Sequence, residues 1–111
     1  MVVRYGVAAE HELANAVETY DRERAGLGGE FLREVQRVEN FLIDHPQLGR
    51  PVRKNRRVLI LNKFPYRLVY DIDKNGIRII AIAHQSRRLE YWWGRVEEAC
   101  LQYGSFNALE T

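Results

Sequence analysis

The sequence has few residues that could cross-link the chain or bind a metal. Cys100 is the only cysteine, so an internal disulfide is excluded. A cysteine-based zinc site would need more thiols or a cluster of histidines, and the 111 residues contain only three histidines. We therefore expect neither a metal nor a cofactor, and we interpret Cys100 as a packed or unused thiol.

Long apolar runs are also missing. No segment approaches the roughly 18 uninterrupted apolar residues of a membrane span. The first residues have neither the basic start nor the apolar stretch of a secretory signal. We expect a soluble protein in the cytoplasm, and a length that suits one domain over residues 1–111. Its core would span about residues 3–95, followed by an extension over 96–111.

The net charge is small, but the charges are unevenly distributed along the chain. The net charge is +2, yet residues 1–49 carry −4 and residues 50–95 carry +9. The densest basic stretch is a Pro- and Gly-containing connection, whose cations are Arg50, Arg53, Lys54, Arg56 and Arg57. This asymmetry indicates that the basic half of the domain binds a polyanionic target or an acidic protein partner. The alternative is that the basic stretch is only a solvated loop.

Two patterns of apolar residues describe the first half of the chain. Val3, Tyr5 and Val7 alternate with other residues and predict a short strand. From Ala9 onward, apolar residues recur at steps of three and four, which predicts a helix that ends at the glycines of residues 26–29. The same spacing resumes at Phe31 and predicts a second helix that stops before Pro46.

The second half alternates with the period of strands. Apolar and β-branched residues cluster over 58–61, 66–72 and 77–83, and Asn75-Gly76 between the last two predicts a tight hairpin. Residues 47–57 are interpreted as an exposed connection. The predicted fold class is α+β, with an N-terminal strand, a helical hairpin, a three-stranded antiparallel meander and a short C-terminal helix from about Glu90.

Four separated motifs stand out along the chain. They are Gly26-Leu27-Gly28-Gly29-Glu30-Phe31, His45-Pro46, Phe64-Pro65-Tyr66-Arg67-Leu68-Val69-Tyr70, and Ile80-Ala81-Ile82-Ala83-His84 followed by Arg87, Arg88, Tyr91 and Trp92. In these motifs and in their order, the sequence resembles the RelE/ParE superfamily of bacterial toxins, the plasmid-stabilisation type of growth inhibitor from type II toxin-antitoxin systems. The resemblance covers about residues 3–95.

The resemblance implies a cognate acidic antitoxin as partner and one of two targets. One branch of the superfamily cleaves messenger RNA on the ribosome, and the other inhibits DNA gyrase. For the nuclease branch, Arg67 would clamp a phosphate and His84 would act as acid or base, with Arg87 and Tyr91 as further donors. Arg88 and the basic connection would contact nucleic acid or the antitoxin.

The hairpin turn bears on this catalytic assignment. A two-residue turn at Asn75-Gly76 places Arg67 directly opposite His84, and a longer turn keeps both side chains on one face. We therefore expect these two residues within reach of a common phosphate. The alternative interpretation is a polar pair without a catalytic role.

One departure favours the gyrase branch. Where well-known ribosome-dependent members carry alternating lysines on the preceding strand, this sequence has Val58 and Ile60. The favoured hypothesis is therefore gyrase inhibition of the ParE kind. The alternatives are a metal-independent, ribosome-dependent endoribonuclease and a decayed toxin that only binds its antitoxin.

Overall fold

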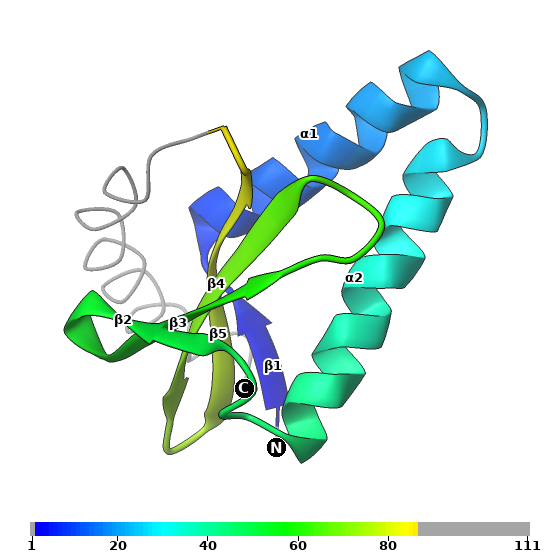
Figure 1. Cartoon of the computed structure of the whole chain (residues 1–111). Coiled ribbons are helices and arrows are strands. Elements are labelled where there is room, and N and C mark those ends of the chain that lie inside the picture. Colours follow the sequence, from blue (N-terminus) through cyan, green and yellow to red (C-terminus); the bar gives the residue numbers. More distant parts are fainter. Residues whose placement is uncertain (1, 87–111) are drawn as a thin grey trace.

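The structure, a computed structural model, describes residues 2–86 and has two layers, a helical hairpin and a five-stranded sheet (Figure 1). The elements in chain order are β1 (Val2–Tyr5), α1 (Val7–Glu23), α2 (Leu27–Asp44), β2 (Arg50–Val52), a 3-10 turn (Arg53–Asn55), β3 (Arg56–Ile60), β4 (Tyr66–Asp73) and β5 (Gly76–His84). The predicted α+β class and its order of strand, helices and antiparallel meander are confirmed. The predicted C-terminal helix and the extension over 96–111 lie outside the described residues.

The sheet has the strand order β1-β5-β4-β3-β2. The strands from β2 to β5 form an antiparallel meander, whereas β1 runs parallel to β5. Parallel neighbours need a long connection, and between β1 and β5 the chain passes through both helices and the strands β2, β3 and β4. The meander has one strand more than predicted, because Arg50–Val52 pairs with Arg56–Val58 inside the stretch that we had interpreted as a connection. That part of the interpretation was wrong.

The helical hairpin turns at Gly26, which has a φ of 90°. Only glycine adopts this left-handed conformation without strain. Gly28 and Gly29 were predicted to belong to the turn, but both lie inside α2. Gly28 instead lets the helices approach closely, since its N–H donates to Asp21 Oδ1 at 2.8 Å and a Cβ there would lie 2.8 Å from that carboxylate.

The main core lies between the helices and one face of the sheet. Phe31, Val35 and Leu42 of α2 are fully buried against Leu68 and Tyr70 of β4. Four rings from both layers pack together with centroids 5.0–6.1 Å apart, mostly edge to face; they are Tyr20, Phe31, Phe64 and Tyr66. This arrangement is favourable for aromatic pairs, and it ties the hairpin to the sheet.

The other face of the sheet carries a smaller apolar cluster and a group of buried charges. The cluster consists of Val58, Val69, Ile80 and Ala81. Beside it, Arg78 makes a bidentate pair with Asp71, and Arg56 Nε lies 3.9 Å from the same carboxylate. Removal of one partner would leave an uncompensated charge at low exposure, so loss of either arginine should destabilise the sheet.

Candidate functional site

Arg67 and His84 lie on opposite faces of the sheet, contrary to the prediction. The β4–β5 turn centres on Lys74 and Asn75, and the register starts with Asp73 opposite Gly76. It then shifts by one residue between Val69 and Tyr70, so that Tyr66 pairs with His84 and Arg67 pairs with Ala83. A bulge adds one residue on one strand, and a shift by one reverses the face of every side chain beyond it.

The extra residue lies on β5, where Ile80 has no partner between Ile79 and Ala81. Ile80 and Ala81 both enter the apolar cluster on the face away from the helices. The pairing argument assumed an unbroken ladder from the turn to residue 84, and this irregularity is the reason it failed.

Arg67 and His84 consequently have separate environments. An Arg67 Nη2 group donates to the carbonyl of Gln85 at 3.1 Å. The His84 ring packs edge to face on Tyr66, with centroids 5.3 Å apart. The Ser86 N–H donates to His84 Nδ1 at 3.1 Å, and the Ser86 hydroxyl lies 2.9 Å from the same nitrogen.

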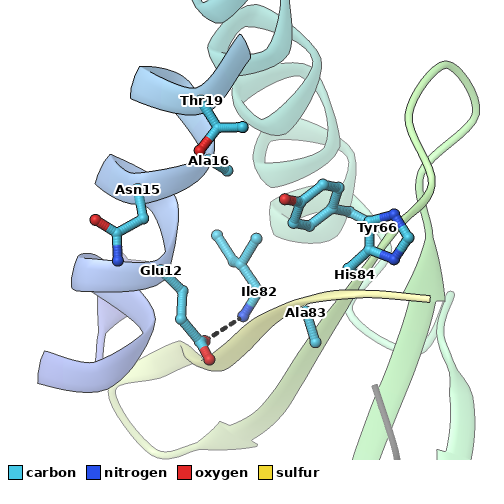
Figure 2. A pocket seen from close by; sticks show the side chains of 8 residues that line it. All are labelled: Glu12, Asn15, Ala16, Thr19, Tyr66, Ile82, Ala83 and His84. Atoms are coloured by element: carbon cyan, nitrogen blue, oxygen red, sulfur yellow. Dashed lines mark hydrogen bonds between the residues drawn. The ribbon is translucent and has the colours of Figure 1, made fainter. Parts of the chain in front are cut away.

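The exposed His84 ring stands at a pocket of about 190 Å³ between α1 and β5 (Figure 2). Glu12, Asn15, Ala16 and Thr19 line it from α1, and Tyr66, Ile82, Ala83 and His84 line it from the sheet. Burial raises the pKa of the Tyr66 phenol, and the negative charges of Glu12 and Glu23 add to the effect. Tyr66 therefore remains protonated at neutral pH. Sequence reasoning missed this pocket because its residues come from distant segments.

The basic connection separates into exposed and structural cations. Arg50, Arg53 and Lys54 are exposed around the tip of the β2–β3 hairpin. Lys54 and Asn55 there have φ values of 63° and 61°, a left-handed conformation that is uncommon for residues with side chains. These three cations are thus the most exposed ones of the basic connection.

Arg56 and Arg57 instead serve the fold. Arg56 donates to the Lys54 carbonyl and lies beside Asp71, and its side chain is only 11% exposed. Arg57 donates to the Gly49 carbonyl at 2.8 Å. The Tyr70 hydroxyl holds the same segment, because it accepts from the Gly49 N–H at 2.8 Å and donates to the Pro46 carbonyl at 2.7 Å.

A second surface feature is an apolar groove of about 260 Å³ between α2 and β3. Its wall includes three of the most exposed large apolar side chains of the described residues: Phe41 at 48%, Leu48 at 50% and Ile60 at 54%. Exposed apolar side chains that share one groove mark an interaction surface more often than scattered ones do. One feature of the sequence indicates this groove: Phe41 lies beside the apolar stripe of the predicted second helix.

Arg37 and Asn62, the polar residues that line this apolar groove, both donate hydrogen bonds to the carboxylate of Glu34. The Glu34 side chain is 3% exposed and pairs with Arg37 through two hydrogen bonds of 2.9 and 3.1 Å. Arg37 lies over the Phe41 ring, 5.8 Å from its centroid. The hydrogen bond from Arg37 lowers the pKa of Glu34, burial opposes this, and the Asn62 N–H lowers it further.

Glu34→Gln should lower the free energy of unfolding by about 1–3 kcal/mol at pH 7, since it removes a charged hydrogen-bonded partner from a buried site. A carboxylate whose pKa is lower in the folded state stabilises it above the unfolded pKa of about 4.3 and loses this effect as the pH falls. Urea unfolding of both proteins between pH 7 and pH 3 should therefore show the difference shrinking below about pH 4.5. A difference that is constant over this range would contradict the role given to the Glu34 charge.

Three predicted site residues, Arg87, Arg88 and Tyr91, lie outside the described residues. Within residues 2–86, no three potential metal ligands come together, and no helix has the length and apolar character needed to cross a membrane. The described part of the chain therefore offers two grooves and a basic hairpin tip, with the predicted catalytic pair divided between two faces.

The model of one family, the ParE toxin of the type II toxin-antitoxin system parDE, matches residues 3–89. The chain belongs to this ParE toxin family. A solved chain described as "Chromosomal ParDE TA system from P. aeruginosa" has a TM-score of 0.66 at 17% sequence identity, covering 76% of this chain and 95% of that chain. At this identity the match shows a shared fold. No curated protein matches the sequence.

Membership of the ParE toxin family makes this chain the toxin of a type II toxin-antitoxin pair, and it gives the surface features a context. A toxin of this kind has an antitoxin as partner. Among the described residues, the exposed basic tip and the apolar groove are the surface features that such a partner could contact.

Proposed function

We propose that this ParE-family toxin arrests growth by binding DNA gyrase and inhibiting it, without cleaving RNA. The observation that carries the proposal is the register of β4 and β5, which leaves Arg67 and His84 on opposite faces of the sheet. Cleavage of RNA needs an acid or base and a cation around one phosphate. Residues that point away from each other across a sheet do not meet this requirement.

The neighbouring strand supports the same proposal. Val58 is 3% exposed and belongs to an apolar cluster, so it offers no charge to a ribosomal or messenger phosphate. Ile60 is exposed but apolar, and it lines the groove with Phe41 and Leu48. An apolar groove suits a protein target or partner better than it suits a polyanion.

For the partner, we propose an acidic antitoxin that covers the basic tip at Arg50, Arg53 and Lys54 and continues along the apolar groove. An acidic, otherwise disordered segment gains charge complementarity and buries apolar side chains as it folds onto a compact basic surface. The two features support this jointly, because both involve the β2–β3 hairpin and the residues just before it.

A supercoiling assay with purified toxin and gyrase tests the target. Stoichiometric toxin should abolish most of the supercoiling activity, and addition of the antitoxin should restore it. Unimpaired gyrase at a stoichiometric excess of toxin would overturn the proposal. Discrete cuts in translated messages after induction, detected by primer extension, would instead establish an endoribonuclease. This is the second hypothesis, with His84 and Arg67 as its candidate residues.

Arg67→Ala and His84→Ala sharpen this comparison. If inhibition requires binding alone, each variant should lose growth arrest only as far as its thermal stability falls. That fall should be small at His84, which is exposed, whereas Arg67 is half-buried and donates to the Gln85 carbonyl. A His84→Ala protein that is folded, binds the antitoxin normally and fails to arrest growth would favour a catalytic role. Harmless overexpression of the unmodified chain would indicate a decayed toxin.

A further inference from the structure

The strand β5 extends well beyond its neighbour β1. β1 pairs only with Gly76–Ile79, and the Gly6 N–H ends the ladder on the Ile79 carbonyl at 2.9 Å. β5 runs on to His84. Within residues 2–86, no strand accompanies this last part of β5 on the side of α1, so its backbone forms an open sheet edge.

A side chain takes the place of a strand at this edge. The Ile82 N–H donates to Glu12 Oε1 at 2.9 Å (Figure 2). The Gln85 N–H donates in the other direction, to the Pro65 carbonyl that precedes β4. Since successive residues of a strand face alternate neighbours, Ile82 and His84 present their backbone groups toward α1. Glu12 thus occupies the position that a peptide carbonyl of a sixth strand would take.

The pocket beside this edge has the lining of a peptide site. Glu12, Asn15, Ala16 and Thr19 recur at steps of three and one and form one stripe of α1, where the small Ala16 leaves room (Figure 2). The stripe offers a carboxylate, an amide and a hydroxyl, which can bond to backbone and to polar side chains. Glu12 is the one carboxylate among the lining residues, so the complementary side chain is a cation.

We propose that the groove between α1 and the open edge of β5 takes up an extended segment of the antitoxin as an additional strand. A carbonyl of that segment replaces Glu12 as the acceptor for the Ile82 N–H, and a lysine or arginine of the segment pairs with the displaced Glu12 carboxylate. Addition of a strand to an exposed edge is a common mode of peptide recognition. The inference rests on the antitoxin partnership proposed above and adds a second contact surface, separate from the β2–β3 tip.

Hydrogen exchange tests the strand directly. The probe is the purified cognate antitoxin, added in excess to the full-length chain. Exchange at the His84 and Ile82 amides should slow by at least about tenfold in the complex, as expected for amides that enter a ladder. Glu12→Gln keeps an acceptor for Ile82 but removes the charge, so it should weaken the complex about tenfold. Glu18→Gln, on the same helix but outside the groove, is the matched control and should bind like the unmodified chain.

The outcomes separate the two proposals. No complex at all would overturn the proposed partnership. A tight complex in which the His84 amide exchanges as in the free chain, with Glu12→Gln equal to Glu18→Gln, would overturn the added strand and leave the partnership intact. A His84 amide that is already strongly protected from exchange in the free chain would also overturn the added strand, since the chain itself would then fill the edge.

Discussion

Gly28→Ala should destabilise the fold by about 3 kcal/mol, the largest effect that we expect from a single methyl group in this chain. A Cβ at this position would meet the Val17 carbonyl oxygen and lie 2.8 Å from the Asp21 carboxyl group. Relief would require the two helices to separate, and it would also disturb the 2.8 Å bond from the Gly28 N–H to Asp21. A loss of about 3 kcal/mol is a large fraction of the free energy of unfolding of a typical protein, which is about 5–15 kcal/mol.

Gly29→Ala is the matched control, because it makes the same chemical change one residue later in α2. A Cβ there would meet only the end of the Arg33 side chain, at 3.6 Å. Alanine in a helix is favoured over glycine by about 0.5–1 kcal/mol, so this variant should be neutral or slightly more stable. Urea unfolding measures both. Equal free energies of unfolding for the two variants would show that the helices are not packed closely at Gly28.

This contrast also shows what the glycines could reveal in advance. The sequence predicted a turn at residues 26–29, and the chain does turn at Gly26. It did not distinguish a glycine needed for a positive φ from one needed for close packing. The difference depends on the distance between two helices, a tertiary quantity that helical periodicity does not contain.

The strands show the same division between local and tertiary information. Alternation and β-branched residues predicted β3, β4 and β5 to within about two residues at their ends. The bulge at Ile80 was not predictable, because every residue around it is apolar and suits either face of a sheet that is buried on both sides. One extra residue was enough to separate Arg67 from His84.

A candidate surface could be predicted from the sequence only where its residues are consecutive in the chain. The cations of the hairpin tip come from one stretch, and composition alone indicated their charge but not the hairpin. Its division into exposed and structural arginines depends on Asp71 and on the Gly49 carbonyl, which only the fold brings near. The two grooves join residues that lie far apart in the sequence, so no linear pattern indicates them.

The combined variant Arg50→Glu, Arg53→Glu and Lys54→Glu should weaken binding of the acidic antitoxin about a hundredfold at low salt. These three side chains are exposed, so reversing their charges replaces attraction by repulsion while the fold is retained. Arg56 and Arg57 are left unchanged because they hold Asp71 and the Gly49 carbonyl, and their loss would confuse unfolding with weaker binding. Titration by calorimetry at several salt concentrations measures the effect, and thermal unfolding checks the fold.

The control reverses the same number of charges elsewhere, with Arg22→Glu, Arg24→Glu and Arg33→Glu on the helical hairpin. Arg22 and Arg24 form exposed ion pairs at 3.5 Å, Arg22 also donates to the Thr19 hydroxyl at 3.4 Å, and Arg33 is exposed as well. Both variants have the same net charge, so the difference between them isolates the position of the charges. Because the Debye length falls from about 10 Å at 0.1 M salt to about 3 Å at 1 M, the loss at the basic tip should diminish at high salt. Equal losses for the two variants would assign the effect to net charge and refute the tip as a contact surface.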